Sequence, residues 1–281
     1  MILRFRSRIC NLSQKTLIMG VLNVTPDSFF DGGLFLDPAG ALNHAQQMVA
    51  DGADIIDIGG ESTRPGSDTV PLYEEISRTI PVIAALAGKL SVPISIDTRK
   101  AETARCALDA GATMVNDISG LRFDPAMAKV IAAAGVPVCV MHIRGTPQNM
   151  QMSPVYEALI PEIMDSLRES IGIALDGGIA LENIIVDPGI GFGKTFTQNL
   201  EILNRLEEFT ILGRPLLVGV SRKAFIGKIL DDAPASGRLE GTLAAVSVAV
   251  YNGANIIRVH DVKEAARAVR VVDSIRQEKC C

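Results

Sequence analysis

The sequence predicts an α/β protein, a single-domain (β/α)8 TIM barrel, because short apolar runs alternate with helical segments. Eight runs rich in Val and Ile, each bounded by Gly, Pro or Asp, are typical of parallel strands buried on both faces. They span residues 17–24, 55–60, 94–98, 113–118, 138–143, 184–188, 216–221 and 255–261. The 281 residues suffice for one such barrel, which takes about 250. A doubly wound sheet is the alternative, disfavoured because no GxGxxG motif follows the first strand.

Helical segments lie between most of these strands, and glycines mark where several of them end. Apolar residues recur at helical spacing in 38–51, 72–90, 100–109, 124–134, 154–175 and 240–251. Gly52, Gly111, Gly135 and Gly177 follow four of these segments, and glycine is typical just beyond a helix C-terminus. Residues 1–15 precede the first strand. We expect them to be an N-terminal extension that caps the barrel bottom, with the (β/α)8 barrel domain itself at 16–281.

Composition and charge exclude some classes of binding partner. Lys and Arg total 27 against 32 Asp and Glu, a net charge of −5, so the chain lacks the broad positive field that nucleic-acid binding needs. No apolar run approaches the roughly 18 residues of a membrane span, and the first residues contain no sustained apolar segment. The five cysteines form no CxxC pair. We therefore expect a cytoplasmic protein with no nucleic-acid or membrane partner.

Polar side chains fall where the predicted strands end, which is where barrel enzymes carry their chemistry. They are Asn23, Asp57, Asp97, Asn116, Asp117, His142, Asp187, Ser221, Arg258, His260 and Asp261, with Lys223 just after the seventh strand. Asp57 and Asp97 lie within apolar runs, where an unpaired carboxylate costs several kcal/mol, so functional roles are favoured. For Asp117 and Asp261, a structural role in helix capping or turn closure is as well supported as a functional one. His142 is expected to be a core or loop histidine, and His44 a helix-packing one.

Strand alternation sorts these residues by face. Residues two apart share a face, so Arg258 points with His260, and Ser221 with Lys223. Asp and Asn suit a flat heterocycle that bears amine and ring N–H groups, whereas Arg and His suit phosphate oxygens. Oxygen ligands beside a diphosphate suit Mg²⁺. The residues alone thus indicate a small heterocycle with a phosphorylated group but not the reaction. The segments 27–37 and 60–71, which contain glycines, are expected to be lids.

Seven motifs, in order along the chain, resemble the dihydropteroate synthase family. They are MGVLNVTPDSFFDGG (19–33), DIIDIGGESTRPG (54–66), SIDT (95–98), VNDISG (115–120), DPGIGFGK (187–194), GVSRK (219–223) and IRVHD (257–261). The first two motifs are long and specific. The resemblance implies a transferase of folate biosynthesis that condenses 4-aminobenzoate with 6-hydroxymethyl-7,8-dihydropterin diphosphate to 7,8-dihydropteroate and diphosphate. It also implies inhibition by sulfonamides.

The resemblance further implies a role for each matching residue. The pterin would contact Asp97, Asn116, Asp187, Lys223 and Arg258. The diphosphate would contact Asn23, Arg64, Arg258 and His260, with Asn23 also the Mg²⁺ ligand. The 4-aminobenzoate would contact Thr63, Pro65, Phe192, Ser221 and Phe29, with Asp27 on the same closing loop as Phe29. The catalytic residues would be Asp97, Lys223, Arg258 and His260.

The family pattern assigns nothing to the segment MHIRGTPQNMQ, so His142 and Arg144 receive no role. It implies a homodimer that packs through the last helices. The apolar stretch 243–250 fits such an interface or the barrel core equally well.

Three other functions compete with the synthase interpretation. A pterin-binding methyltransferase barrel would share the carboxylates and amides. Methyl transfer, however, does not require the diphosphate-binding residues that the STRP and SRK segments supply. A Schiff-base aldolase would use Lys223 as its nucleophile. A catalytically silent pterin-binding protein would not need both groups of residues.

Overall fold

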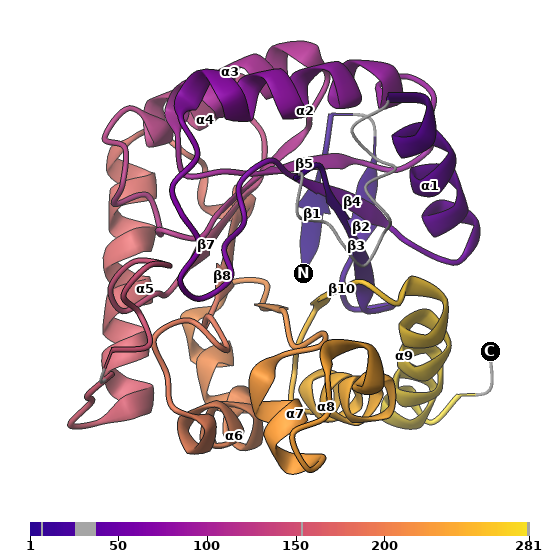
Figure 1. The fold of residues 1–281 in the computed structure, drawn as a ribbon, viewed down its shortest axis with the longest axis vertical. Helices are drawn as coiled ribbons and strands as arrows, with labels where there is room; N and C mark the ends of the chain where they lie inside the picture. Colours follow the sequence, from indigo (N-terminus) through magenta and orange to yellow (C-terminus); the bar gives the residue numbers. More distant parts are fainter. Residues whose placement is uncertain (7, 26–37, 153, 280–281) are drawn as a thin grey trace.

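Eight parallel strands form the centre of the computed structural model, which describes residues 1–6, 8–25, 38–152 and 154–279. A ring of helices surrounds them (Figure 1). The strands are β3 (Leu17–Asn23), β4 (Ile55–Gly59), β5 (Ile94–Asp97), β6 (Met114–Asp117), β7 (Val138–Met141), β8 (Ile184–Asp187), β9 (Leu217–Val218) and β10 (Ile256–Val259). Each lies within one of the predicted runs, so the alternation of apolar runs located all eight strands.

The sheet closes on itself. Its strand order is β8-β7-β6-β5-β4-β3-β10-β9, and a parallel bridge between Val186 and Leu216 joins the two outermost strands. The Val186 amide also donates to the carbonyl of Pro215 at 2.9 Å. The fold is therefore a (β/α)8 barrel and not a doubly wound sheet. β9 is much shorter than its predicted run, because it pairs with β10 only at Leu217 and Val218.

Nine α-helices of the described residues cover the outside of the barrel. They are α1 (Pro38–Ala50), α2 (Leu72–Leu86), α3 (Ala101–Ala110), α4 (Met127–Ala134), α5 (Leu159–Asp176), α6 (Phe196–Asn204), α7 (Ala224–Ile229), α8 (Leu239–Tyr251) and α9 (Val262–Gln277). Short 3-10 helices occur at η2 (Leu181–Asn183), η3 (Leu206–Leu212) and η4 (Ala235–Gly237). No helix in the part of the chain that the structure describes is long and apolar enough to cross a membrane.

Two predicted helices begin later than their apolar pattern indicated. The carboxylate of Asp124 accepts from the amides of Ala126 and Ala101, so residues 124–126 form a turn before α4. The carboxylate of Glu162 likewise accepts from the amides at 157 and 158, just before α5 begins. In both segments a side chain bonds the backbone in place of the helix. Three further helices, α6, α7 and α9, occupy segments where no helix was predicted.

The N-terminal hairpin covers the end of the barrel at which the strands begin. β1 (Ile2–Arg4) pairs antiparallel with β2 (Ile9–Asn11). Its side chains join one buried apolar cluster with inward-facing residues of seven barrel strands: Leu3, Phe5, Cys10, Leu12, Leu17, Met19, Ile55, Met114, Cys139, Ile185, Leu217 and Ile256. The division into an extension at 1–15 and a barrel domain at 16–281 stays a prediction.

Alternation along the strands then determines what the opposite end of the barrel contains. Residues one position on from this cluster, such as Ile18 and Ile56, point outward into the larger core beneath the helices. Residues two positions on point inward again. On β4, β6 and β10 these are Asp57, Asn116 and Arg258, all polar. The apolar floor of the barrel is therefore followed by a polar layer at the carboxyl ends of the strands.

Candidate active site

An arginine links three strands across the polar layer. The Arg258 Nε of β10 donates to Asp57 Oδ2 of β4 at 2.6 Å, and its Nη2 donates to Asp97 Oδ2 of β5 at 2.7 Å. Both carboxylates are buried. Each of the three charges thus has an oppositely charged partner, which a buried charge requires.

Asp57 supports the site from beneath. It is fully buried, and its Oδ2 also accepts from Asn116 Nδ2 at 3.3 Å. Because its contacts are with Arg258 and Asn116, Asp57 orients two residues that the resemblance assigns to the pterin. The functional interpretation of this carboxylate from its apolar surroundings therefore becomes a positioning role.

Asp97 and Asn23 both lie beside Gly59, which carries no side chain, at the mouth of the barrel. A Cβ placed on Gly59 would lie 3.6 Å from Asp97 Cβ and 3.7 Å from Asn23 Oδ1, so both side chains border the same glycine. Burial raises the pKa of Asp97 to about 7, and the positive charge of Arg258 opposes that rise. Asp97 can therefore gain or lose a proton near neutral pH.

The segment after β8 brings Asp187, Phe192 and Lys223 together. The Asp187 Oδ1 accepts from the Gly189 amide at 2.7 Å, and burial raises the pKa of Asp187 to about 6 against that hydrogen bond. The Lys223 Nζ lies 4.2 Å from the centroid of the Phe192 ring. Burial and the nearby Arg258 lower the pKa of Lys223 to about 8. Gly191 has φ of +84°, and a Cβ there would lie 3.1 Å from Lys223 Cδ, so only glycine suits this position.

A buried lysine holds the same segment in place. The Lys194 Nζ is hydrogen-bonded to His142 Nδ1 at 2.7 Å, Gly189 O at 2.8 Å and Phe192 O at 3.0 Å. His142 is itself buried, and burial lowers its pKa to about 2. It is the core histidine that was predicted. Lys194 ends the DPGIGFGK motif, yet sequence reasoning gave it no role, because nothing in the motif shows that its side chain folds back onto the preceding carbonyls.

Ser221 and His260 face each other just beyond the ends of the neighbouring strands β9 and β10. The Ser221 Oγ accepts from the His260 amide at 3.2 Å and lies 3.0 Å from His260 Nδ1. Burial, together with the charge of Arg258, lowers the pKa of His260 to about 3. Its imidazole is therefore neutral at physiological pH. Since the Ser221 oxygen already accepts from the backbone, its hydrogen can be donated to Nδ1, which leaves the imidazole proton on Nε2.

Two of the strand-end carboxylates prove to be structural. Asp117 accepts from the amides of Ser119 and Leu121 at 2.7 and 3.1 Å, which closes the turn after β6. Asp261 forms two hydrogen bonds with the guanidinium of Arg222, at 2.6 and 3.0 Å. The structure therefore favours the turn-closing alternative for Asp117, whereas the Asp261 side chain pairs with Arg222 and does not cap α9.

Loop two, residues 60–71 between β4 and α2, carries Thr63, Arg64 and Pro65. Thr63 is half-buried, whereas Arg64 and Pro65 are exposed. Within the described residues, the Arg64 side chain forms no ion pair. Phe29 and Asp27, with the whole predicted lid at 27–37, lie outside the described residues.

The part of the chain that the structure describes contains no cluster of three His, Cys, Asp or Glu side chains that could hold a metal ion. Asn23 supplies one amide oxygen at the mouth. This fits an ion such as Mg²⁺ only if a substrate phosphate and water complete its shell, which is how Mg²⁺ is commonly bound.

Comparison with known proteins agrees with this geometry. The pattern of the pterin binding enzyme family matches residues 19–260. The dihydropteroate synthase of Synechocystis sp. is 52% identical over 262 residues, which cover 93% of this chain and 91% of the relative. The crystal structure of the Yersinia pestis dihydropteroate synthase with a sulfonamide drug complex has a TM-score of 0.94 and 44% identity, covering 99% of this chain and 100% of that one. The Xanthomonas albilineans dihydropteroate synthase with 4-aminobenzoic acid has a TM-score of 0.90 and 39% identity over 98% of each chain.

A barrel whose mouth combines buried carboxylates, an amide and a lysine is the site of a pterin-binding enzyme. The chain belongs to the pterin binding enzyme family.

Proposed function

We propose that this protein is a dihydropteroate synthase, which condenses 4-aminobenzoate with 6-hydroxymethyl-7,8-dihydropterin diphosphate in folate biosynthesis. The observation that carries the proposal is the polar layer at the mouth of the barrel. In it, Arg258 pairs with the carboxylates of Asp57 and Asp97 and lies on the side of the mouth proposed to bind the diphosphate. The Synechocystis relative, similar over almost the whole chain, is a dihydropteroate synthase. The products are 7,8-dihydropteroate and diphosphate.

The pterin is recognised by groups with complementary hydrogen-bonding capacity. Because Asn116 Nδ2 is turned toward Asp57, its Oδ1 is left to accept from a ring N–H. Asp187 accepts from the 2-amino group and a ring N–H, while the Lys223 ammonium donates to the ring oxygen or a ring nitrogen. Arg258 keeps an Nη1 edge for the diphosphate while Asp57 and Asp97 hold its other nitrogens.

The reaction separates charge, and the site provides a counter-charge at each end. The C–O bond to the diphosphate breaks with its electron pair on oxygen, and positive charge develops on the pterin methylene carbon. The Asp97 carboxylate stabilises that carbon, while Arg258, Arg64 and the His260 Nε2–H donate to the leaving diphosphate. The amine of 4-aminobenzoate then attacks the carbon and loses a proton. An arylamine is unprotonated near pH 7, so the reaction needs no strong general base.

Thr63, Pro65, Phe192 and Ser221, with Phe29, form the proposed 4-aminobenzoate site. The face of Phe192 that does not cover Lys223 can stack on the benzoate ring, and the ring then lies between loop two and the pterin. Sulfonamides, which resemble 4-aminobenzoate, would compete for this place.

Asn23 would hold Mg²⁺ together with the substrate diphosphate, and the ion would neutralise charge on the leaving group. With one protein oxygen, the site should bind Mg²⁺ weakly until the diphosphate is present. Titration calorimetry of Mg²⁺ with and without inorganic diphosphate tests this. Equal affinity in both titrations would contradict the assignment.

The competing functions leave parts of the site unexplained. A methyltransferase has no use for Arg258, His260 and Arg64 as anion ligands. A Schiff-base lysine needs open approach to its amine, whereas Lys223 Nζ lies against the Phe192 ring. Borohydride treatment with carbonyl compounds should therefore trap no adduct at Lys223. A silent pterin-binding protein would bind the ligands without releasing diphosphate.

Titration of ligand binding distinguishes the synthase from the methyltransferase. We expect the diphosphate ester of the pterin, with Mg²⁺, to bind at least tenfold more tightly than 6-hydroxymethylpterin. Equal affinity of the two would contradict a site built for a diphosphate and favour the methyltransferase.

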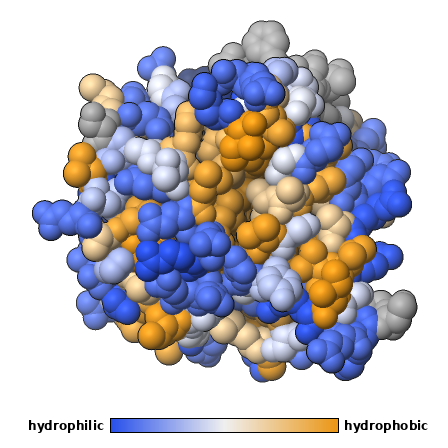
Figure 2. All heavy atoms as spheres, turned by 90° about the horizontal axis from the view of Figure 1, so that it is seen from below, coloured by the Kyte–Doolittle hydropathy of each residue, from blue (hydrophilic) through white to orange (hydrophobic). Residues whose placement is uncertain are grey.

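Two helices present apolar side chains that fit a homodimer interface. Val248 and Tyr251 of α8 are 45% and 64% exposed, and Val271 and Ile275 of α9 are 60% and 61% exposed. Figure 2 shows the face that carries α6, α7 and α8, where apolar patches interrupt the hydrophilic surface. Since the homodimer implied by the resemblance packs through the last helices, we assign the interface to α8 and α9. The enzyme would work in the cytoplasm on small-molecule substrates.

A further inference from the structure

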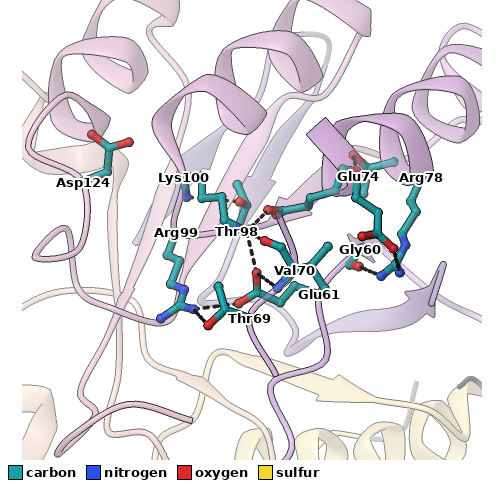
Figure 3. Close-up of polar contacts among 12 residues, drawn as sticks. Gly60, Glu61, Thr69, Val70, Glu74, Arg78, Thr98, Arg99, Lys100 and Asp124 are labelled. Atoms are coloured by element: carbon teal, nitrogen blue, oxygen red, sulfur yellow. Dashed lines mark hydrogen bonds and ion pairs between the residues drawn. The ribbon is translucent and has the colours of Figure 1, made fainter. Parts of the chain in front are cut away.

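A charged cluster lies outside the site described above, at the base of loop two. It consists of Glu61, Glu75, Arg99 and Lys100, and we call it the base cluster. Figure 3 labels Glu61, Arg99 and Lys100. None of these four side chains is more than 10% exposed. Two carboxylates and two cations balance each other. The proposed mechanism uses none of them.

The ion pairs of the base cluster run from loop two to the turn between β5 and α3. Glu61 Oε1 accepts from Arg99 Nη2 at 2.8 Å, and Glu61 Oε2 accepts from Lys100 Nζ at 2.5 Å. Lys100 Nζ also donates to Glu75 Oε2 at 2.5 Å. The guanidinium of Arg99 stacks over the ring of Phe123, with Cζ 4.3 Å from the centroid. Arg99 is thereby fixed on its other face.

The same side chains hold the two ends of loop two together. Glu61 Oε2 accepts from the Val70 amide at 3.2 Å, and Lys100 Nζ donates to the Val70 carbonyl at 2.8 Å. Arg99 Nη2 lies 3.3 Å from the Thr69 hydroxyl oxygen. Figure 3 shows Glu61, Thr69 and Val70 converging on Arg99 and Lys100. Residues 62–68, with Thr63, Arg64 and Pro65, project from this closed base.

The outer part of the loop has much less support. A cavity of about 180 Å³ lies between loop two and residues 146–148, lined among others by Ser67 and Thr69. One backbone hydrogen bond crosses to that segment, from the Gly66 amide to the Pro147 carbonyl at 3.0 Å. The position of the loop over the barrel mouth therefore depends on its base.

A gain in the stability of the fold does not by itself explain why the base cluster contains four buried charges. Replacing a buried ion-pair network by apolar residues is often neutral or stabilising, because burial costs each charge its hydration. What the network does provide is directional geometry between loop two and β5. Arg99 and Lys100 follow closely after Asp97, the strand-end carboxylate of β5, so the cluster sets the loop relative to a catalytic group.

We propose that Glu61 is a positioning residue of this enzyme, which acts through loop two to place Thr63 and Pro65 over the 4-aminobenzoate site. The inference rests on the proposed function. The substrate whose binding depends on Glu61 is the arylamine, since the pterin contacts on β5, β6 and β8 do not depend on loop two.

The substitution Glu61→Gln tests this in the full-length protein. It keeps the size of the side chain but removes the charge that holds Arg99 and Lys100. We expect KM for 4-aminobenzoate and the inhibition constant of a sulfonamide to rise tenfold or more. The dissociation constant of 6-hydroxymethylpterin should stay within twofold. Glu102→Gln is the matched control, because Glu102 forms an exposed ion pair with Arg105 on α3 and should leave every constant within twofold.

The outcomes separate the positioning role from its alternatives. An unchanged KM for 4-aminobenzoate in folded Glu61→Gln would overturn the inference, as would an equal loss of affinity for the arylamine and the bare pterin. If Glu61→Gln does not fold, Arg99→Lys replaces it: the charge remains but the double contact to Glu61 and Thr69 is lost. This variant should raise KM at least threefold, and an unchanged KM would overturn the inference. Failure of the proposed function is distinct, because the unmodified protein would then release no diphosphate on addition of 4-aminobenzoate.

Discussion

Arg258 and Asp97 are 161 positions apart in the chain, yet the guanidinium donates to the carboxylate at 2.7 Å inside the barrel. This ion pair joins the side of the mouth assigned to the diphosphate to the side assigned to the pterin. Breakage of the C–O bond would separate charge between the same two sides. The pair thus places an anion and a cation where the two developing charges would appear.

Replacing Asp97 by Asn should abolish most of the turnover. The variant keeps the shape of the side chain but removes the negative charge beside the reacting carbon. Loss of one preorganised electrostatic contact commonly lowers kcat by about 10²–10³-fold. Arg258 retains Asp57 as a partner, so the thermal unfolding temperature should change little. Steady-state kinetics and calorimetry check both points, and a kcat within threefold of the unmodified protein would remove Asp97 from the mechanism.

Lys223→Ala should also reduce turnover by orders of magnitude, because the pterin loses an ammonium donor and the Phe192 ring loses its cationic neighbour. The loss should appear chiefly in kcat/KM for the pterin diphosphate. Near-normal kinetics of this folded variant would dismiss Lys223 as a pterin ligand.

The pH profile of kcat/KM for the pterin diphosphate should be bell-shaped, since it reports groups of the free enzyme. The activity should rise as Asp97 ionises near pH 7, because the carboxylate is the form that stabilises the cation. It should fall as the Lys223 ammonium loses its proton near pH 8. In Lys223→Arg the side chain cannot deprotonate in this range, so the alkaline limb should disappear. Persistence of that limb would assign it to another group.

Changes at loop two should affect inhibitors more than substrate. Thr63→Ala and Pro65→Ala alter the exposed rim of the proposed 4-aminobenzoate site, where a sulfonamide extends beyond the smaller substrate. We expect the factor by which the sulfonamide inhibition constant rises to be at least fivefold larger than the factor by which KM for 4-aminobenzoate rises. Equal factors for the two ligands would contradict this pocket geometry.

The proposed dimer can be tested on α9. Val271→Arg places a charge on the exposed apolar face and should shift the molar mass in sedimentation experiments from two chains toward one. Arg270→Ala, on the exposed surface of the same helix, is the control and should not change the mass. A monomeric unmodified protein, or a dimer that survives Val271→Arg, would argue against this interface.

Much of the barrel follows from the sequence, because its signals are local. Apolar runs located the strands, and three polar residues predicted at strand ends, Asp57, Asn116 and Arg258, prove to be hydrogen-bonded to one another through Asp57. The partner of Asp57 was not predictable, since its contact with Arg258 spans 201 positions. The ion pair between Glu61 and Arg99 in the base cluster was not predictable for the same reason, because these residues are 38 positions apart.

One helix that was not predicted does have a signal in the sequence. Thr195 and Gln198 form a reciprocal capping box at the start of α6, and the T-x-x-Q spacing was present in the sequence. The fold of Lys194 onto Gly189 and Phe192 had no such signal, because a lysine after glycines is usually exposed. The short β9 arises from pairing with its neighbour, which a pattern of apolar residues does not encode.

The most direct test of the account is diphosphate release by the purified protein with 6-hydroxymethyl-7,8-dihydropterin diphosphate and Mg²⁺, measured with and without 4-aminobenzoate. We predict release that depends on 4-aminobenzoate and matches the 7,8-dihydropteroate formed mole for mole. Tight binding of the pterin with no release in either mixture would contradict the proposed synthase activity.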